Sequence, residues 1–131
     1  MPKIVLFVLS AFLILPSCKQ RDSQSAQALD IGNFEKKLNN TPDRILLDVR
    51  TSPEYQQGHL ANSIMIDIHS QDFTEQVNKL DRSKPVFVYC ASGIRSEKAA
   101  NILKDQGFRE IYHMDGGLNE WVNANRPIVK D

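Results

Sequence analysis

Two short apolar segments, each followed by a stretch with helical spacing, constrain the fold of this chain more than any other feature. Arg44–Val49 (RILLDV) and Pro85–Tyr89 (PVFVY) are almost continuously apolar and do not alternate with polar residues. Such runs are typical of strands buried on both faces, as in a parallel sheet covered by helices. Because strand and helix patterns alternate along the rest of the chain, the sequence predicts an α/β fold with a mainly parallel central sheet and helices on both faces.

The remaining elements follow from helical spacing and from turn residues. Asp30 is a candidate N-cap for the first helix, and Gly107 closes the helix that follows Pro85–Tyr89. The expected helices are Ile31–Asn39, a short turn from Ser52 to Gly58, Asp72–Leu80, Glu97–Gln106, and one after Gly116-Gly117 with Leu118, Trp121 and Val122 on its core face. The expected further strands are the short segments Ser63–Ile68 and Glu110–His113.

Length and composition predict one globular domain. The chain has 131 residues, of which 41% are hydrophobic and 24% charged, as in ordinary single domains. Lys+Arg and Asp+Glu both number 16, so the zero formal net charge gives no indication of a nucleic-acid partner. Two cysteines, Cys18 and Cys90, are too few for a disulfide scaffold or a thiolate metal site. His59, His69 and His113 have no metal-binding spacing, so no metal is expected.

The N-terminal segment has the pattern of an export signal. Lys3 is followed by Ile4–Leu15, which is apolar except for Ser10. This run is too short to span a bilayer, which takes roughly 20 residues, but it fits the core of a signal peptide. Leu15-Pro16-Ser17-Cys18 then resembles a bacterial lipobox, with a proline at a position where that pattern commonly has another residue.

The lipobox divides the chain into three parts: a lipoprotein-type signal peptide at residues 1–17, a polar tether at residues 18–29 and a folded domain at residues 30–131. Cys18 would carry the lipid, and Cys90 would be the only free thiol. We therefore expect an exported protein, anchored by its lipid to a membrane on the periplasmic side or elsewhere in the cell envelope. The alternative is an ordinary secretory signal in which Cys18 is incidental.

Cys90 is the candidate catalytic residue. It follows a predicted buried strand and precedes a predicted helix, where backbone N–H groups point at an anion and favour the thiolate. The plainer interpretation of a cysteine at the end of a core strand is an inert small hydrophobe. Gly93, which permits a tight loop, and Arg95, a fixed positive charge, argue against that interpretation. The residues expected to form the anion-binding loop are Ala91, Ser92, Gly93, Ile94, Arg95 and Ser96.

The loop Cys-x-x-Gly-x-Arg-Ser resembles the active-site loop of rhodanese-like sulfurtransferases. Two flanking stretches extend the resemblance over Asp48 to Trp121: Leu47-Asp48-Val49-Arg50 with Glu54-Tyr55 and Gly58-His59-Leu60 upstream, and Met114-Asp115-Gly116-Gly117-Leu118 with Trp121 downstream. Two departures lie outside the loop. Asn62-Ser63 stands where the family usually has Gly-Ala, and Leu60 stands where Ile is common.

The resemblance implies a single rhodanese-like domain and a sulfurtransferase reaction. Cys90 would take the outer sulfur of thiosulfate or a persulfide donor as a covalent persulfide and pass it to an acceptor such as cyanide, a small thiol or a protein. The reaction implies no cofactor, since the loop amides and the helix dipole stabilise the sulfur anion. The expected partners are thus small anionic sulfur donors and thiophilic acceptors. We also expect contact with a membrane through the N-terminal lipid, no nucleic-acid partner, and a monomer.

Outside the loop, Asp48 and Arg50 have two interpretations. In the structural one, Arg50 pairs with Glu54, and Asp48 accepts N–H groups of a neighbouring loop. In the other, Arg50 lies at the mouth of the site and attracts an anionic sulfur donor. Gly116-Gly117 is expected to permit close backbone packing, and Trp121 to lie in the core.

Two other functions share parts of this pattern. Cysteine-dependent phosphatases and arsenate reductases use a Cys-x5-Arg loop, often with a His before the cysteine, whereas this chain has Cys-x4-Arg preceded by Tyr89. A loop one residue shorter makes a narrower cradle, which suits one sulfur atom better than a tetrahedral oxyanion. The second alternative is a non-catalytic module in which Cys90 only stores, carries or senses sulfur.

Overall fold

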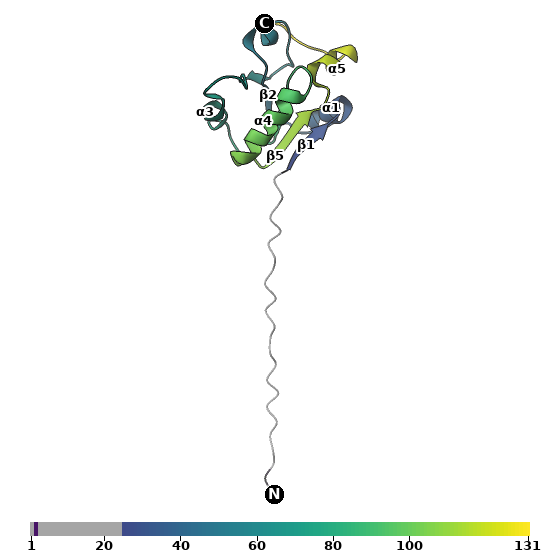
Figure 1. Ribbon diagram of the computed structural model, residues 1–131. Helices are drawn as coiled ribbons and strands as arrows, with labels where there is room; N and C mark the ends of the chain where they lie inside the picture. The colour runs from purple at the N-terminus through teal and green to yellow at the C-terminus, as the bar shows by residue number, and fades with distance from the viewer. Residues whose placement is uncertain (1, 3–24) are drawn as a thin grey trace.

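The computed structural model describes residues 2 and 25–131 (Figure 1). A five-stranded sheet runs through the domain in the order β1-β5-β4-β2-β3, and all of its strand pairs are parallel. The strands are β1 (Ser25–Leu29), β2 (Ile45–Asp48), β3 (Ile64–Met65), β4 (Val86–Tyr89) and β5 (Glu110–Met114). The helices are α1 (Ile31–Asn39), α2 (Ser52–Gln56), α3 (Phe73–Val77), α4 (Ile94–Asp105) and α5 (Gly117–Asn123).

Helices cover both faces of the sheet, as the sequence predicts. One core cluster joins α3 and α4 to one face, where Val86 and Val88 of β4 point. The other joins α1 and α5 to the opposite face, where Phe87 and Tyr89 point. All four residues of β2 and all four of β4 are buried, which is why these strands read as continuous apolar runs rather than alternating ones. The described residues thus contain a three-layer α/β fold with its own two-sided core.

Several elements match their predicted bounds. The first helix spans Ile31–Asn39, and the Asp30 side chain caps it by accepting a hydrogen bond from the Asn33 N–H at 2.8 Å. The last strand extends one residue beyond its predicted end, to Met114. Trp121 is buried in the core as expected, whereas Val122 is 44% exposed and does not face the core. The third helix and the third strand are shorter than predicted.

The predicted tether is wrong in its last five residues. Ser25–Leu29 form β1, which pairs with β5 from Ser25–Glu110 to Leu29–Met114. The segment SAQAL gives no strand signal because an edge strand buries little: Ala26 and Leu29 are only partly buried. The folded domain therefore begins before Asp30. Apart from Pro2, the predicted signal peptide lies outside the described residues, as do Cys18 and the rest of the tether. Among the described residues, no helix is long and apolar enough to cross a membrane.

Candidate active site

Cys90 lies where β4 ends, at the carboxyl end of the sheet, and has no exposed surface. Its Sγ accepts hydrogen bonds from two backbone N–H groups, Gly93 at 3.1 Å and Ser96 at 3.3 Å. Both donors belong to the turn that becomes the first turn of α4. Two N–H groups directed at one sulfur favour negative charge on it, as does the N-terminus of a 12-residue helix.

The helix after Cys90 begins three residues earlier than predicted. Gly93 has a φ of 99°, a left-handed conformation that suits glycine, and α4 starts directly after it at Ile94. Ile94, Arg95 and Ser96 are therefore helical residues rather than loop residues. Ala91 and Ser92 remain in the loop, and Ile94 projects into solvent with 75% of its surface exposed.

Ser96 contacts the sulfur with its side chain as well as with its backbone. The thiol of Cys90 lies 3.6 Å from Ser96 Oγ, and that hydroxyl donates to the Gly93 carbonyl at 3.0 Å. Ser96 is fully buried, so its hydroxyl has few other hydrogen-bond partners within reach. When the sulfur is a thiolate, the hydroxyl can turn and donate to it instead.

The N-terminus of α5 holds the outer side of the loop. The N–H groups of Leu118 and Asn119 donate to the carbonyls of Cys90 and Ala91 at 2.8 and 3.0 Å. These bonds direct the loop carbonyls toward α5 and away from the sulfur. Gly117 makes the approach possible, since a Cβ there would lie 2.4 Å from the Ala91 carbonyl oxygen. The close backbone packing expected of Gly116-Gly117 is therefore confirmed at Gly117.

Arg95 pairs with Glu54 of α2. Its two terminal nitrogens each donate to one carboxylate oxygen of Glu54 at 2.8 Å. Glu54 Oε2 also accepts the N–H and the hydroxyl of Thr51, which closes a capping box at the start of α2. These hydrogen bonds lower the pKa of Glu54 far below its usual range, and those from Arg95 have the largest effect. Sequence reasoning missed the Arg95–Glu54 pair. It also missed the capping box, although Thr51-x-x-Glu54 carries the sequence signal for one.

Arg50 does not pair with Glu54, and it does not lie at the mouth of the site. It is buried and donates to both carboxylate oxygens of Asp48 at 2.7–3.0 Å, and to the Gly58 carbonyl at 2.8 Å. Burial lowers its pKa, but the bonds with Asp48 outweigh that effect and leave the pKa raised. Asp48 accepts the N–H of Arg50 itself rather than that of a neighbouring loop. Both residues thus support the turn after β2, but with partners other than those that the structural interpretation predicted.

The two departures from the family pattern fit their positions. Asn62 has a φ of 63°, so it occupies a backbone conformation that glycine adopts readily and asparagine tolerates. Tyr89 accepts the Leu60 N–H at 3.0 Å and donates to Ser63 Oγ at 3.3 Å. Burial raises the pKa of Tyr89 above its usual range, so the phenol stays neutral. The residues Leu60 and Ser63 therefore join the upstream stretch to the strand that carries Cys90.

The three histidines lie apart from one another and from Cys90 in their contacts. No group of three or more metal-ligating side chains occurs among the described residues. His59 is buried and stacks on Tyr55 with 3.7 Å between ring centroids. His113 is also buried, and its Nδ1 has no hydrogen-bond partner among the described residues. His69 stays on the surface beside Asp67.

A family comparison covers most of the domain. Residues 31–124 match the family model described as the rhodanese-like domain. A rhodanese-related protein from Thermoplasma volcanium has a similar structure, with a TM-score of 0.69, 28% sequence identity and coverage of 80% of this chain and 99% of that chain. The rhodanese-like domain of a protein from Anabaena sp. has a TM-score of 0.71 and 25% identity over 82% of this chain and 81% of that chain.

The curated relatives are longer proteins. A tRNA uridine(34) hydroxylase from Cytophaga hutchinsonii is 38% identical over 86 residues, which are 63% of this chain and 28% of the relative. One from Citrobacter koseri is 32% identical over 116 residues, which are 80% of this chain and 33% of the relative. The chain therefore spans about a third of the length of the hydroxylases that it matches.

Proposed function

The chain belongs to the rhodanese-like domain family, and from that premise we propose that it is a sulfurtransferase acting through a persulfide on Cys90. The observation that carries the proposal is the cradle of N–H donors around Cys90 Sγ. The sulfur accepts hydrogen bonds from the N–H groups of Gly93 and Ser96, and N–H groups of α5 donate to the loop carbonyls. A cradle of N–H donors stabilises a sulfur anion before and after the transfer. No separate base is needed when the sulfur is already a thiolate.

The reaction has two balanced steps. The Cys90 thiolate attacks the outer sulfur of thiosulfate, a new S–S bond forms, and the old S–S bond breaks so that sulfite leaves with the electron pair. An acceptor such as cyanide then attacks the outer sulfur of the persulfide, and thiocyanate leaves as the Cys90 thiolate is restored. The N–H groups of Ile94 and Arg95, in the first turn of α4, have no acceptor within that helix and could bind the outer sulfur.

The buried sulfur sets a requirement on the donor. Because Cys90 has no exposed surface, the donor must present its reactive atom through the loop, or the loop must open. Thiosulfate and persulfides present a single terminal sulfur, whereas a phosphate monoester presents a tetrahedral group. Both terminal nitrogens of Arg95 are bound to Glu54, and a phosphatase would need that guanidinium for its oxyanion. These contacts favour sulfur transfer over phosphate hydrolysis.

The hydroxylation named for the longer relatives is not part of the proposal, since this chain aligns with a third of those proteins or less. A non-catalytic sulfur carrier remains a second candidate, because the same cradle would hold a stored persulfide. The two differ in turnover. A carrier takes up one sulfur and releases it only to its partner, whereas an enzyme cycles with free cyanide or a small thiol.

The test is to incubate the protein with thiosulfate and to measure its intact mass before and after cyanide. We expect a gain of one sulfur atom that cyanide removes, with repeated turnover. Cys90→Ser should show no gain, whereas Thr74→Ala, at an exposed position of α3 outside the loop, should behave as the parent does. Uptake by Cys90→Ser would reject Cys90 as the sulfur acceptor, and uptake without turnover would favour the carrier.

We also propose that residues 1–17 direct export and that Cys18 carries a lipid, as the lipobox pattern predicts. In a bacterial expression host, the chain should fractionate with membranes and incorporate radiolabelled palmitate. Cys18→Ser should lose both properties, while Cys90→Ser serves as the matched control that keeps them. A chain without label that stays in the cytosol would overturn the assignment of the N-terminal segment.

A further inference from the structure

The two ends of the sheet carry opposite charge. All strands are parallel, so they begin at one end of the domain, the amino end, and finish at the other, the carboxyl end, where Cys90 lies. Seven basic side chains lie at the amino end: Lys36, Lys37, Arg44, Arg82, Lys84, Lys104 and Arg109. Four acidic side chains lie there: Asp43, Asp81, Asp105 and Glu110. The amino end is therefore net basic.

The carboxyl end has the opposite balance. Nine acidic side chains lie there: Asp30, Glu35, Glu54, Asp67, Asp72, Glu97, Asp115, Glu120 and Asp131. Four basic ones accompany them: Arg95, Lys98, Arg126 and Lys130. The other charged residues of the domain cancel in pairs, Asp48 with Arg50 and Glu75 with Lys79. A chain with zero formal net charge thus folds into a domain with a basic end and an acidic end.

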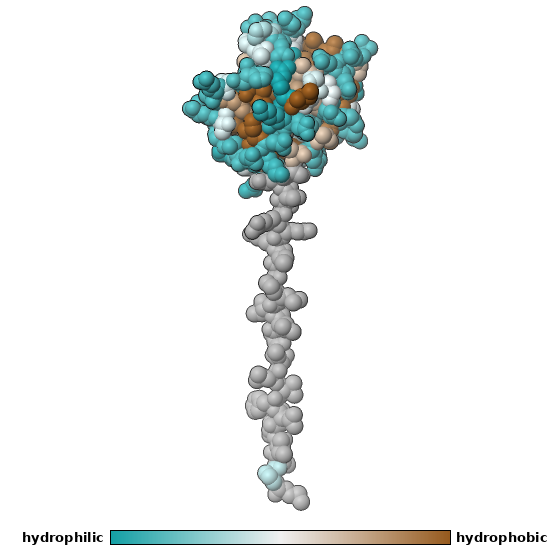
Figure 2. Space-filling view, viewed as in Figure 1, coloured by the Kyte–Doolittle hydropathy of each residue, from teal (hydrophilic) through white to brown (hydrophobic). Residues whose placement is uncertain are grey.

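Local structure places these lysines and arginines. Lys36 and Lys37 lie in the last turn of α1, and Lys104 lies in the last turn of α4, where a positive charge is favourable beside the helix carbonyls. Arg82 reaches the same end of α4 by donating to the Gln106 carbonyl at 2.7 Å. In Figure 2, this end of the domain is mostly hydrophilic. A partner of negative charge is therefore favoured at this end.

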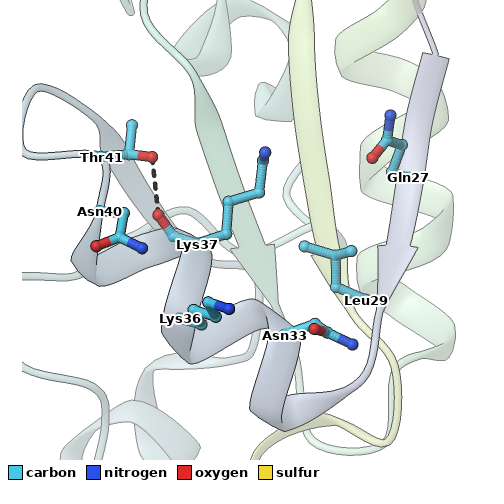
Figure 3. A pocket seen from close by; sticks show the side chains of 7 residues that line it. All are labelled: Gln27, Leu29, Asn33, Lys36, Lys37, Asn40 and Thr41. Atoms are coloured by element: carbon cyan, nitrogen blue, oxygen red, sulfur yellow. Dashed lines mark hydrogen bonds between the residues drawn. The ribbon is translucent and has the colours of Figure 1, made fainter.

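A polar cleft opens between α1 and the edge strand β1 (Figure 3). Its volume is about 470 Å³, and it is lined by Gln27, Leu29, Asn33, Lys36, Lys37, Asn40 and Thr41. Its lining thus has two cations, three side-chain amides and no carboxylate, and one of the amides, that of Asn33, already donates to the neighbouring Asp30 carboxylate at 2.8 Å. Lys37 lies over the Tyr112 ring at 4.6 Å, and neither lysine has a carboxylate partner among the described residues. The cleft can therefore accept an anionic group.

The chain enters the domain at this same end. β1 begins at Ser25, at the amino end of the sheet, whereas the Cys90 loop lies at the carboxyl end, where α4 begins (Figure 1). From Cys18 to Ser25 the chain can span at most roughly 25 Å when fully extended. A surface that holds Cys18 would therefore lie within that reach of the amino end.

We propose that the amino end binds the headgroups of an anionic lipid bilayer, with one headgroup seated in the cleft between α1 and β1, so that the Cys90 loop faces away from the membrane. Each Lys or Arg near an anionic surface strengthens binding by roughly fivefold. The net excess of three positive charges at the amino end then corresponds to about a hundredfold preference over neutral lipid. The acidic carboxyl end is repelled from the same surface, which fixes the orientation.

The test is vesicle binding by residues 19–131, which include the whole fold, with circular dichroism to confirm folding. Binding to phosphatidylcholine vesicles is compared with binding to vesicles that also contain phosphatidylglycerol, at low and at physiological ionic strength. We expect binding only to the anionic vesicles, weakened by salt because exposed charges are screened over roughly 10 Å. The measurement needs no sulfur donor, so its failure and a failure of the proposed sulfur transfer are distinguishable.

Two matched double variants give the sharpest control. Lys36→Gln/Lys104→Gln and Lys98→Gln/Lys130→Gln each remove two exposed lysines and the same overall charge, but at opposite ends of the sheet. The first should weaken binding about twenty-fivefold, and the second less than twofold. Equal losses, or equal binding to neutral vesicles, would overturn the proposal. So would binding to unfractionated tRNA but not to vesicles, which would assign the amino end to nucleic acid, and so would binding to neither.

Discussion

The two ends of the sheet use their residues in opposite ways. At the carboxyl end, the position of single atoms is fixed: Cys90 Sγ has two N–H donors, and Gly117 approaches the Ala91 carbonyl at a distance that leaves no room for a Cβ. At the amino end, charges contribute through their sum, and where they have partners, as Lys84 has Asp43 and Arg82 has the Gln106 carbonyl, these contacts do not form a single site. The comparison teaches that the geometry around Cys90 depends on individual residues, whereas the positive charge of the amino end is spread over many.

The largest expected effect comes from Gly117→Ala. Its φ of 62° disfavours a side chain, and a Cβ there would lie 2.4 Å from the Ala91 carbonyl oxygen, so the backbone of the loop must move. We expect a loss of about 2 kcal/mol in the free energy of unfolding and a loss of sulfur uptake of more than tenfold. Denaturant unfolding and the rate of persulfide formation measure the two effects. Gly32→Ala, in the exposed part of α1 with room for a Cβ, is the control and should leave uptake unchanged.

The next effect is the loss of the Glu54–Arg95 pair. Glu54→Gln removes the charge that holds Arg95 beside the loop, and we expect kcat/KM for sulfur transfer to fall several-fold. Glu54→Asp, which keeps the charge, should restore part of the rate. The matched control is Glu35→Gln, since Glu35 also pairs with an arginine, Arg126, and both glutamates are 34% exposed. A similar loss in Glu35→Gln would show that any broken ion pair lowers the rate.

A smaller effect links pH to the interior of the sheet. Burial lowers the pKa of His113, despite the opposing charges of Glu97 and Asp115. The unfolded chain therefore takes up a proton near pH 6.5, before the folded one does. Stability should fall as the pH drops from about 6.5 toward the folded pKa. His113→Gln should flatten this dependence in unfolding curves measured across that range, and an unchanged slope would exclude His113 as its source.

The smallest effect belongs to the amino end. Arg109 is exposed, and no ion pair or side-chain hydrogen bond joins it to another described residue. Arg109→Gln should change the free energy of unfolding by less than about 0.5 kcal/mol and leave sulfur transfer unchanged. The lost positive charge should affect only binding to anionic vesicles, whose affinity should fall roughly fivefold. A large loss of stability would show that single residues matter at this end too.

The sequence predicted the layers of the fold because its strongest patterns are local. The apolar runs of β2 and β4 and the helical spacing of α1 depend on residues close in the chain. Cys90 could be found because it follows such a run. β1 was missed since an edge strand of small and polar residues carries almost no apolar pattern.

The pairing of charges could not be predicted, because it depends on which loops the topology brings together. Glu54 lies four residues from Arg50, yet it pairs with Arg95, 41 residues away, since β2 and β4 are neighbours in the sheet. Arg50 instead turns back to Asp48 in the interior. The separation of charge between the two ends was hidden for the same reason, as a net charge of zero says nothing about where the charges lie.

The place of β1 at the edge of the sheet determines when this domain can finish folding during synthesis. Ser25 is among the first residues of the sheet to leave the ribosome, but its partner Glu110 lies 85 positions later. The strand must wait until β5 has been made, and it is held on one side only. Any pulling force on the N-terminus acts on β1 before it reaches the core. As an edge strand whose partner is made late, β1 is therefore expected to join the sheet last and to leave it first.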